Sequence, residues 1–204
     1  MEKRFQGTGK WENKAMYKIL MSLIRKRPRD LVKLCTLAAR EAYRNKSNVI
    51  LTKHFQKIFE EYSQGRIQDT INEYRSELSN IDKLLFGMKP NKKEKTTSDS
   101  FVFTTSELQS KINNIIQQNR FAFANGNIAT ARELAHFLYK INFLTARKVV
   151  EDGEIDRKYF EENRYLSNIS ADFGYDWEIH PAYRWALQPD TLDDIFRKLS
   201  LSSD

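Results

Sequence analysis

The sequence predicts a mainly α-helical protein that carries one small β-hairpin. Apolar residues recur at helical spacing through most of the chain. Glycine and proline, the residues that interrupt helices, number only 7 and 4 in 204 positions. The strongest hairpin signal is Asp152-Gly153, which lies between two stretches that can form strands. A chain of this length is enough for one ordinary domain or two small ones.

Cysteine and histidine usage excludes several kinds of site. The single cysteine, Cys35, cannot form an internal disulfide or a multi-cysteine zinc site, and we expect it to be a small buried residue. The three histidines are scattered along the chain. No apolar run approaches the roughly 18 residues that span a bilayer, and the N-terminus is charged. We therefore expect a cytoplasmic protein with no metal site and no membrane contact.

Charge is distributed unevenly along the chain. Residues 1–95 hold 22 Lys and Arg against 11 Asp and Glu, whereas residues 96–204 hold 12 against 16. The positive excess is concentrated in residues 1–57, where 15 basic residues accompany four acidic ones. Such a surface attracts the phosphate of nucleotides or nucleic acids. A solvated helical surface that only keeps the protein soluble is the alternative explanation.

Residues 1–63 are expected to form a unit of three helices. The first covers residues 12–25, and Pro28 then begins a second helix that runs to about Tyr43. After a short extended segment, Thr52 is expected to be the N-cap of the third helix. The residues expected to point inward are apolar and helically spaced: Met16, Ile19, Leu20, Leu23 and Ile24, then Leu31, Leu34, Cys35, Ala38 and Ala42, then Phe55, Ile58, Phe59 and Tyr62.

Residues 64–165 are expected to form a second unit. Its first part is an amphipathic stretch at 66–87, which predicts two short helices. The polar stretch 88–100 predicts a loop. A short strand at 101–103 and a helix at 105–117, opened by Thr104 or Thr105, are expected to follow.

The second half of this unit contains the predicted hairpin. A helix at 129–142 leads into a strand at 143–150, and a return strand at 155–160 follows the turn. Helices followed by a strand, a tight turn and a strand are typical of the end of a winged-helix domain. The remaining residues, 166–204, are rich in aromatic side chains. We expect them to pack on the body as a tail and to end in a short polar helix from about Leu192.

The helix at 129–142 and the first strand of the hairpin supply candidate contacts to nucleic acid. In DNA-binding proteins of this kind, one helix enters the major groove. The candidates are the basic side chains expected on the surface of these two elements: Arg132, His136, Lys140, Arg147 and Lys148. The hairpin also carries acidic residues, which oppose phosphate contact, so a protein-contact or scaffold role is the alternative.

No catalytic constellation can be assigned. Gly7-Thr8-Gly9-Lys10 resembles a fragment of a phosphate-binding loop, but it lacks the upstream glycine, and Trp11 stands where Ser or Thr belongs. No serine lies in a glycine-flanked elbow. Glu178 and His180 are two residues apart, a spacing that does not orient an acid–base pair, so we expect His180 to be structural. The chain is therefore expected not to be an enzyme and to have no cofactor of its own.

Several segments resemble parts of P-loop ATPases. Residues 26–35, with Pro28-Arg29 at a helix start, and the continuation to residue 52 resemble the helical lid of AAA+ and related STAND-type ATPases. Residues 138–147 and 176–187 resemble the C-terminal region of a prokaryotic P-loop ATPase family. By this resemblance Arg29 takes the sensor position that contacts nucleotide phosphates, with Arg27 as its neighbour. Arginine suits this role because its planar fork binds phosphate oxygens bidentately.

The resemblance implies a function for the chain. Because the phosphate-binding and magnesium-binding strands of the family have no counterpart in the sequence, it implies a non-enzymatic regulatory module that senses nucleotide state in trans. The implied partner is a P-loop ATPase core or another protein subunit, with ATP bound only when that partner is present. Some relatives of the family act in phage defence. The alternative is a stand-alone winged-helix protein, of the helix-turn-helix type, that binds double-stranded DNA.

Overall fold

The computed structural model describes residues 10–11, 14–25, 27–90, 100–150, 155–163 and 174–188. Within these residues the protein is mainly helical with a small antiparallel sheet, as the sequence predicts. Three expected features lie outside the described residues: the Asp152-Gly153 turn, most of the loop at 88–100, and the helix from about Leu192.

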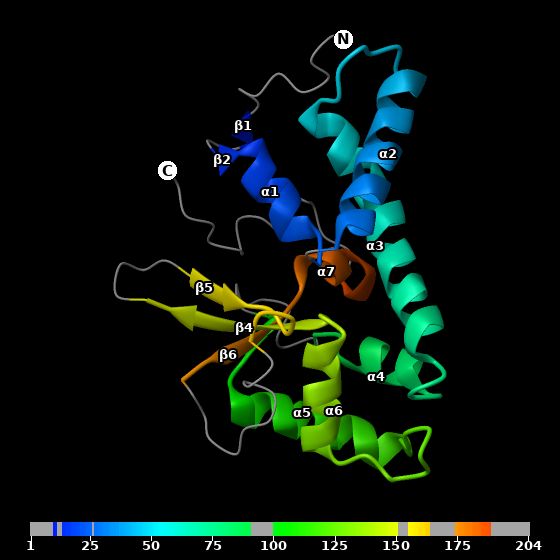
Figure 1. The fold of residues 1–204 in the computed structure, drawn as a ribbon, viewed down its shortest axis with the longest axis vertical. Helices are drawn as coiled ribbons and strands as arrows, with labels where there is room; N and C mark the ends of the chain where they lie inside the picture. The colour runs from blue at the N-terminus through cyan, green and yellow to red at the C-terminus, as the bar shows by residue number, and fades with distance from the viewer. Residues whose placement is uncertain are drawn as a thin grey trace.

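The described elements follow one another from a short N-terminal hairpin to a helix near the C-terminus (Figure 1). In chain order they are β1 (Lys10–Trp11), β2 (Lys14–Ala15), α1 (Met16–Leu23), α2 (Pro28–Arg44), α3 (Thr52–Tyr74), α4 (Ile81–Gly87), β3 (Val102–Phe103), α5 (Thr105–Gln118), α6 (Ala131–Lys140), β4 (Leu144–Val149), β5 (Ile155–Lys158), β6 (Asp176–Ile179) and α7 (Pro181–Leu187).

The helices α1, α2 and the first half of α3 share one hydrophobic cluster in the upper part of Figure 1. Pro28 stands at the start of α2, where its missing N–H breaks no helical hydrogen bond. Two expected core positions on α2, Leu31 and Cys35, are only half-buried, and Leu37 is buried instead. The prediction that Cys35 is buried was wrong, because the buried face of α2 is formed by Leu34, Leu37 and Ala38.

The helix α3 begins at Thr52, one residue earlier than expected, and extends much further than expected. Leu51, not Thr52, is the N-cap, and its N–H donates to Nδ1 of His54 at 3.0 Å. The helix then continues without interruption through the expected division between residues 63 and 64. Its hydrophobic contacts change along its length, since Tyr62 belongs to the upper cluster and Ile67 to a second, lower cluster.

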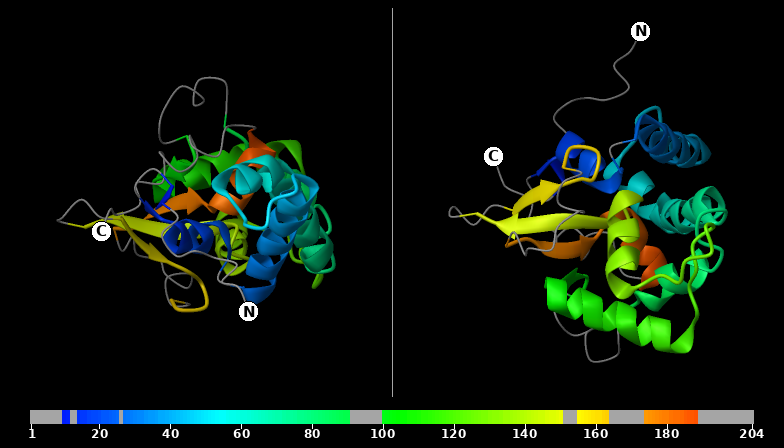
Figure 2. Two further views of the ribbon diagram at one scale, coloured as in Figure 1. Left: turned by 90° about the horizontal axis from the view of Figure 1, so that it is seen from above. Right: turned by 60° about the horizontal axis from the view of Figure 1, so that its bottom comes forward.

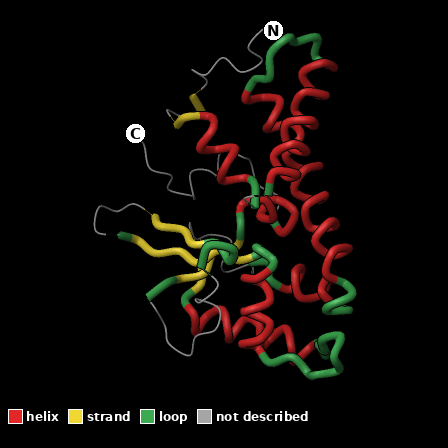
Figure 3. The backbone as a smooth tube through the Cα atoms, viewed as in Figure 1, coloured by secondary structure: helices red, strands yellow, loops and turns green. Residues whose placement is uncertain are grey.

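The lower cluster lies between the remaining helices and a four-stranded antiparallel sheet of order β3-β6-β4-β5. Thr104 and Thr130 cap α5 and α6, because each hydroxyl accepts a hydrogen bond from the N–H three residues later. The sequence predicted β3, α5, α6, β4 and β5, but not β6, which lies between β3 and β4. The strands occupy one side of the molecule (Figure 3), and β4 and β5 extend away from the helices (Figure 2).

The helix α7 joins the two clusters. Ala182 packs in the upper cluster, whereas Tyr183 and Leu187 pack in the lower one. Figure 1 accordingly shows α7 in the middle of the molecule, beside α3. The described part of the expected tail, residues 174–188, therefore packs on the body, although neither β6 nor α7 was expected there.

A buried carboxylate fastens the sheet to α7. Glu178 of β6 is 1% exposed and accepts hydrogen bonds from Arg157 of β5 and from Arg184 of α7, the latter at 3.2 Å. Arg147 of β4 lies 3.8 Å from the same carboxylate. Burial would raise the pKa of Glu178, but the charges of Arg184 and Arg157 outweigh it and lower that pKa. The ionised carboxylate thus holds three strands and one helix together.

We expect Glu178→Gln to lower the free energy of unfolding by about 3–5 kcal/mol, because it leaves the buried Arg184 without a counter-ion. Urea unfolding at neutral pH measures the loss. Asp156→Asn is the control, since it breaks the half-exposed 3.0 Å pair with Lys158 on β5. That change is expected to remove about 1 kcal/mol at most. Equal losses in the two variants would contradict the role given to Glu178.

Candidate functional site

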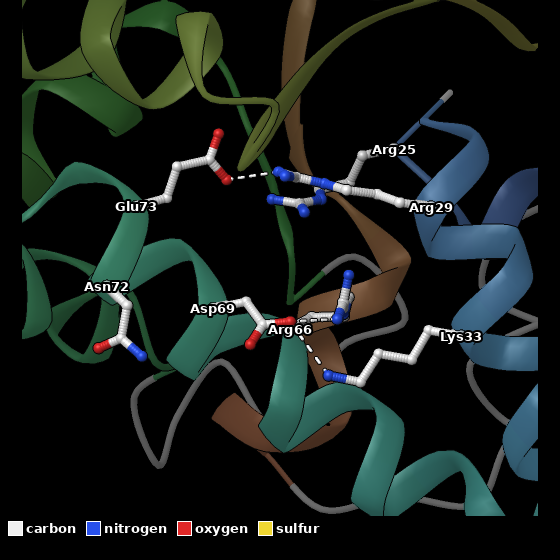
Figure 4. A pocket seen from close by; sticks show the side chains of 7 residues that line it. All are labelled: Arg25, Arg29, Lys33, Arg66, Asp69, Asn72 and Glu73. Carbon is white, nitrogen blue, oxygen red and sulfur yellow. Dashed lines mark hydrogen bonds and ion pairs between the residues drawn. The ribbon is translucent and has the colours of Figure 1, made fainter.

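The candidate site is a pocket of about 360 Å³ between α2 and α3. Figure 4 shows side chains of α2 reaching toward side chains of α3 across this pocket. The spacing on each helix explains the arrangement, because residues three or four apart share one helix face. The lining residues are polar or charged: Arg25, Arg29, Lys33, Arg66, Asp69, Asn72 and Glu73.

Two ion pairs cross the mouth of the pocket. Arg29 lies 2.6 Å from a carboxylate oxygen of Glu73, and the ammonium of Lys33 lies 3.1 Å from Asp69. All four side chains are partly exposed, and Arg29 is the most exposed at 59%. Ion pairs of this kind contribute about 1 kcal/mol or less. A bound anion could therefore compete with these carboxylates for Arg29 and Lys33.

Arg27 shares the carboxylate of Glu73 with Arg29. Its guanidinium donates to both oxygens of Glu73, at 2.9 and 3.1 Å, and to the hydroxyl of Tyr74 at 3.0 Å. Burial would raise the pKa of Glu73, but the charges of Arg27 and Arg29 outweigh it and lower that pKa. The structure therefore brings together the two arginines that the sequence predicted for phosphate contact, around one ionised carboxylate.

The floor of the pocket is a buried charge network. Asp30 is fully buried and accepts hydrogen bonds from Arg25, at 2.8 Å, and from Arg66. Burial would raise the pKa of Asp30, but the hydrogen bond and charge of Arg25 and the charge of Arg66 lower it. Arg66 also pairs with Asp69, yet its Nε has no hydrogen-bond partner although the side chain is only 3% exposed.

We call the two groups of ion pairs at this pocket, one around Glu73 and one around Asp30 and Asp69, the α2–α3 charge ladder. Every carboxylate in the ladder contacts two cations, and the cations outnumber the carboxylates by two. An excess of positive charge around a pocket attracts anions. The members are the cations Arg25, Arg27, Arg29, Lys33 and Arg66 and the carboxylates Asp30, Asp69 and Glu73.

Arg25 connects the ladder to α3 and α7. Its guanidinium donates to the hydroxyls of Thr70, at 3.0 Å, and Tyr183, at 2.9 Å. These two hydroxyls are themselves 3.0 Å apart. The ladder is therefore hydrogen-bonded to the helix that joins the two hydrophobic clusters.

His180 fixes the backbone beside Arg25. Its Nδ1 accepts a hydrogen bond from the N–H of Ala182 at 3.2 Å, so its Nε2 carries the proton and donates to the carbonyl of Ile24 at 3.1 Å. Burial lowers the pKa of His180 to about 3, which keeps the ring neutral. Its complete burial and its two backbone partners agree with the structural role expected from the sequence.

The nucleic-acid candidates on α6 are only partly available at the surface. Arg132 is exposed. The ring of His136 packs against Phe160, with centroids 6.1 Å apart, and burial lowers its pKa. Lys140 forms an ion pair with Glu77 at 2.6 Å.

The two candidates on β4 also differ in their exposure to solvent. Arg147 is 14% exposed and faces Glu178, whereas Lys148 is exposed and lies over the ring of Tyr175. Successive residues of a strand point to opposite faces of the sheet. The structure therefore does not gather the five candidates on one open basic surface.

The described residues were also searched for metal-binding groups and for membrane-spanning helices. Among them, no group of three or more His, Cys, Asp and Glu side chains is placed to hold a metal ion. No helix in this part of the chain combines the length and apolar character needed to cross a bilayer.

Comparison with known proteins gives one result for the region of the pocket. Residues 3–71 match a family model described as a FunZ-associated C-terminal helical domain. The match includes α1, α2 and most of α3, and with them five of the seven residues that line the pocket. This similarity is to a helical domain from a C-terminal position, and its description does not mention a P-loop ATPase. No curated protein and no solved structure matches the chain.

We expect stability to fall on acidification because His180 must stay neutral in the folded protein. Its pKa of about 3 in the folded state lies below the ordinary value of about 6.5, so the unfolded chain binds more protons in this interval. The contribution of His180 is complete above about pH 6.5 and declines by about 1.4 kcal/mol per pH unit as the pH falls toward the folded pKa.

Urea unfolding near neutral pH and near pH 5 measures this dependence. His180→Asn removes the titrating group and should flatten the pH dependence, whereas His136→Asn, at a less buried ring, should change it less. A full pH dependence in the His180→Asn variant would assign the effect to other groups.

Proposed function

We propose that this chain is a non-enzymatic interaction module that contacts the phosphates of a nucleotide held by a partner protein. The α2–α3 charge ladder carries this proposal, because its cations exceed its carboxylates by two around an open pocket. Arg29 makes the first contact, since it is the most exposed cation of the ladder. Its planar guanidinium pairs with two phosphate oxygens at once.

The partner in this proposal is a P-loop ATPase core supplied by another chain. The resemblance of residues 26–52 to an AAA+ lid supports it, because Arg29 and Arg27 then take the sensor position and its neighbour. The position of both arginines at the start of α2 agrees with that resemblance. ATP would be bound at the junction of the two chains, with the adenosine held by the partner.

The module transmits phosphate contact to the rest of its own fold in this proposal. Arg25 links the ladder to Tyr183 of α7, and α7 is fastened to the sheet through Arg184 and Glu178. The elements from α4 to β5 are the part proposed to contact a further protein; their order along the chain supports a winged-helix assignment, although β6 lies between β3 and β4 in the sheet.

Catalysis is not part of the proposed function. A general base needs a carboxylate or imidazole that is free to accept a proton from substrate. The three carboxylates of the ladder are each held by two cations, and the pKa values of Asp30 and Glu73 are lowered. Nucleotide hydrolysis would require the partner core.

A stand-alone DNA-binding function is the weaker alternative. Four of the five candidate residues pack or pair within the protein: His136, Lys140, Arg147 and Lys148. If this alternative were correct, Arg132→Ala would weaken binding of a short labelled duplex, measured by fluorescence anisotropy over a salt series.

The proposed function predicts that phosphate groups bind weakly to the pocket of the isolated chain, because the ladder is complete within it, whereas tight binding of ATP requires the partner. We expect ATP and pyrophosphate to shift the ¹H–¹⁵N amide signals of α2 and α3 around the pocket in a saturable manner. Arg29→Ala should weaken this binding by about tenfold, since it removes charge-assisted hydrogen bonds worth about 1.5 kcal/mol or more.

Arg40→Ala is the matched control, because Arg40 lies on the same helix and pairs with Glu61 of α3 at 2.7 Å, outside the pocket. It should bind both ligands as the unchanged chain does. The absence of shifts at the pocket, or equal weakening by both substitutions, would overturn the proposed function. ATP hydrolysis by the chain alone would contradict its non-enzymatic character.

A further inference from the structure

Two carboxylates of α3 form ion pairs with the cations at the mouth of the pocket. Glu73 holds Arg29, and Asp69 holds Lys33. An anion that binds these cations must therefore displace a carboxylate that is already part of the protein. The displaced carboxylate stays attached to α3 nearby and repels the incoming negative charge.

The strength of this competition depends on the charge of the ligand. A monoanion that replaces Glu73 puts one negative charge in the place of another, so little binding free energy is gained. A phosphate monoester carries about −1.5 to −2 at neutral pH and offers three strong acceptor oxygens. A group of that charge also balances the excess of two positive charges in the ladder.

The floor of the pocket contains a buried donor without a partner. Arg66 lines the pocket, is 97% buried, and keeps one N–H donor without a partner. Lys33 lies beside it, since both contact Asp69. This N–H of Arg66 is shielded from solvent, so a phosphate at the mouth reaches it only if the side chains around the pocket move apart.

We propose that Glu73 makes this pocket selective for terminal phosphate groups and excludes phosphodiesters, each of which carries a single negative charge. Glu73 is then a specificity-determining residue, and the nucleic-acid backbone is the ligand that it rejects. This inference rests on the proposed function, because it concerns the same phosphate site.

Glu73 rather than Asp69 is the residue that can be tested cleanly. Asp69 also pairs with the buried Arg66, so its removal would disturb the floor of the pocket. Glu73 is partly exposed, and Arg27 keeps its hydrogen bond to Tyr74 when Glu73 is neutralised. Glu73→Gln therefore frees Arg29 while the buried network stays intact.

The test compares pyrophosphate with an oligothymidylate that has no terminal phosphate, each titrated into the full chain and followed by the amide signals of the pocket. The unchanged chain should bind pyrophosphate more tightly than the oligonucleotide. Glu73→Gln should raise the affinity for the oligonucleotide by about tenfold, the equivalent of about 1.4 kcal/mol. Its affinity for pyrophosphate should rise by less, so that the selectivity falls.

Two further variants control for net charge and for folding. Glu61→Gln makes the same charge change in the pair with Arg40 across the same two helices, outside the pocket, and should leave the selectivity unchanged. Glu73→Asp keeps the charge and should keep the selectivity, which tests the inference even if Glu73→Gln folds poorly.

The outcomes separate the inference from the proposed function. If the unchanged chain binds pyrophosphate in the pocket but Glu73→Gln keeps the original selectivity, the inference is overturned and the proposed function stands. An equal loss of selectivity in Glu61→Gln also overturns the inference, because it shows a general charge effect. If pyrophosphate does not bind in the pocket at all, both are overturned.

Discussion

The structure around the pocket depends on one buried carboxylate. Asp30, in the first turn of α2, holds Arg25 from the segment before that helix and Arg66 from α3. All three side chains are buried, so each charge would be unfavourable without the others. Replacing Asp30 alone would leave two guanidiniums in the interior without their shared counter-ion. The network therefore fixes the start of α2 against α3 and places Arg29 over the pocket.

The same network explains why α7 lies at the centre of the fold. Tyr183 brings a hydroxyl to Arg25 and Thr70, while its ring packs in the lower hydrophobic cluster. Arg184, the next residue, bonds to Glu178 in the sheet. A continuous series of polar contacts thus runs from the pocket to the sheet through one short helix. In the proposed function, this helix is the candidate connection between the pocket and the rest of the surface.

The helices were predictable because their signals are local, whereas the site depends on contacts between helices. Apolar spacing located α5 and α6, and a threonine cap was predicted for α5, but the burial of Leu37 instead of Cys35 depends on how α2 meets its neighbours. Arg27 and Arg29 were predicted from the resemblance to a lid, and Glu73, the carboxylate that binds both, was not predicted. The spacing of Asp69 and Glu73 matches that of Lys33 and Arg29, yet this match has meaning only once α2 and α3 are known to lie side by side.

The fold changes how the many basic residues among the first 57 are interpreted. Its cations are not a uniformly solvated surface, because Arg29, Lys33 and Arg40 are paired with acids of α3. Their long-range attraction for phosphate is thereby reduced, since each pair is nearly neutral at a distance. What the pairing leaves is an excess of two positive charges in the ladder, besides exposed lysines such as Lys46 and Lys53 elsewhere in this segment. A site built in this way depends on how strongly a ligand competes with the protein's own carboxylates, and that competition favours a compact, doubly charged phosphate over a chain of singly charged ones.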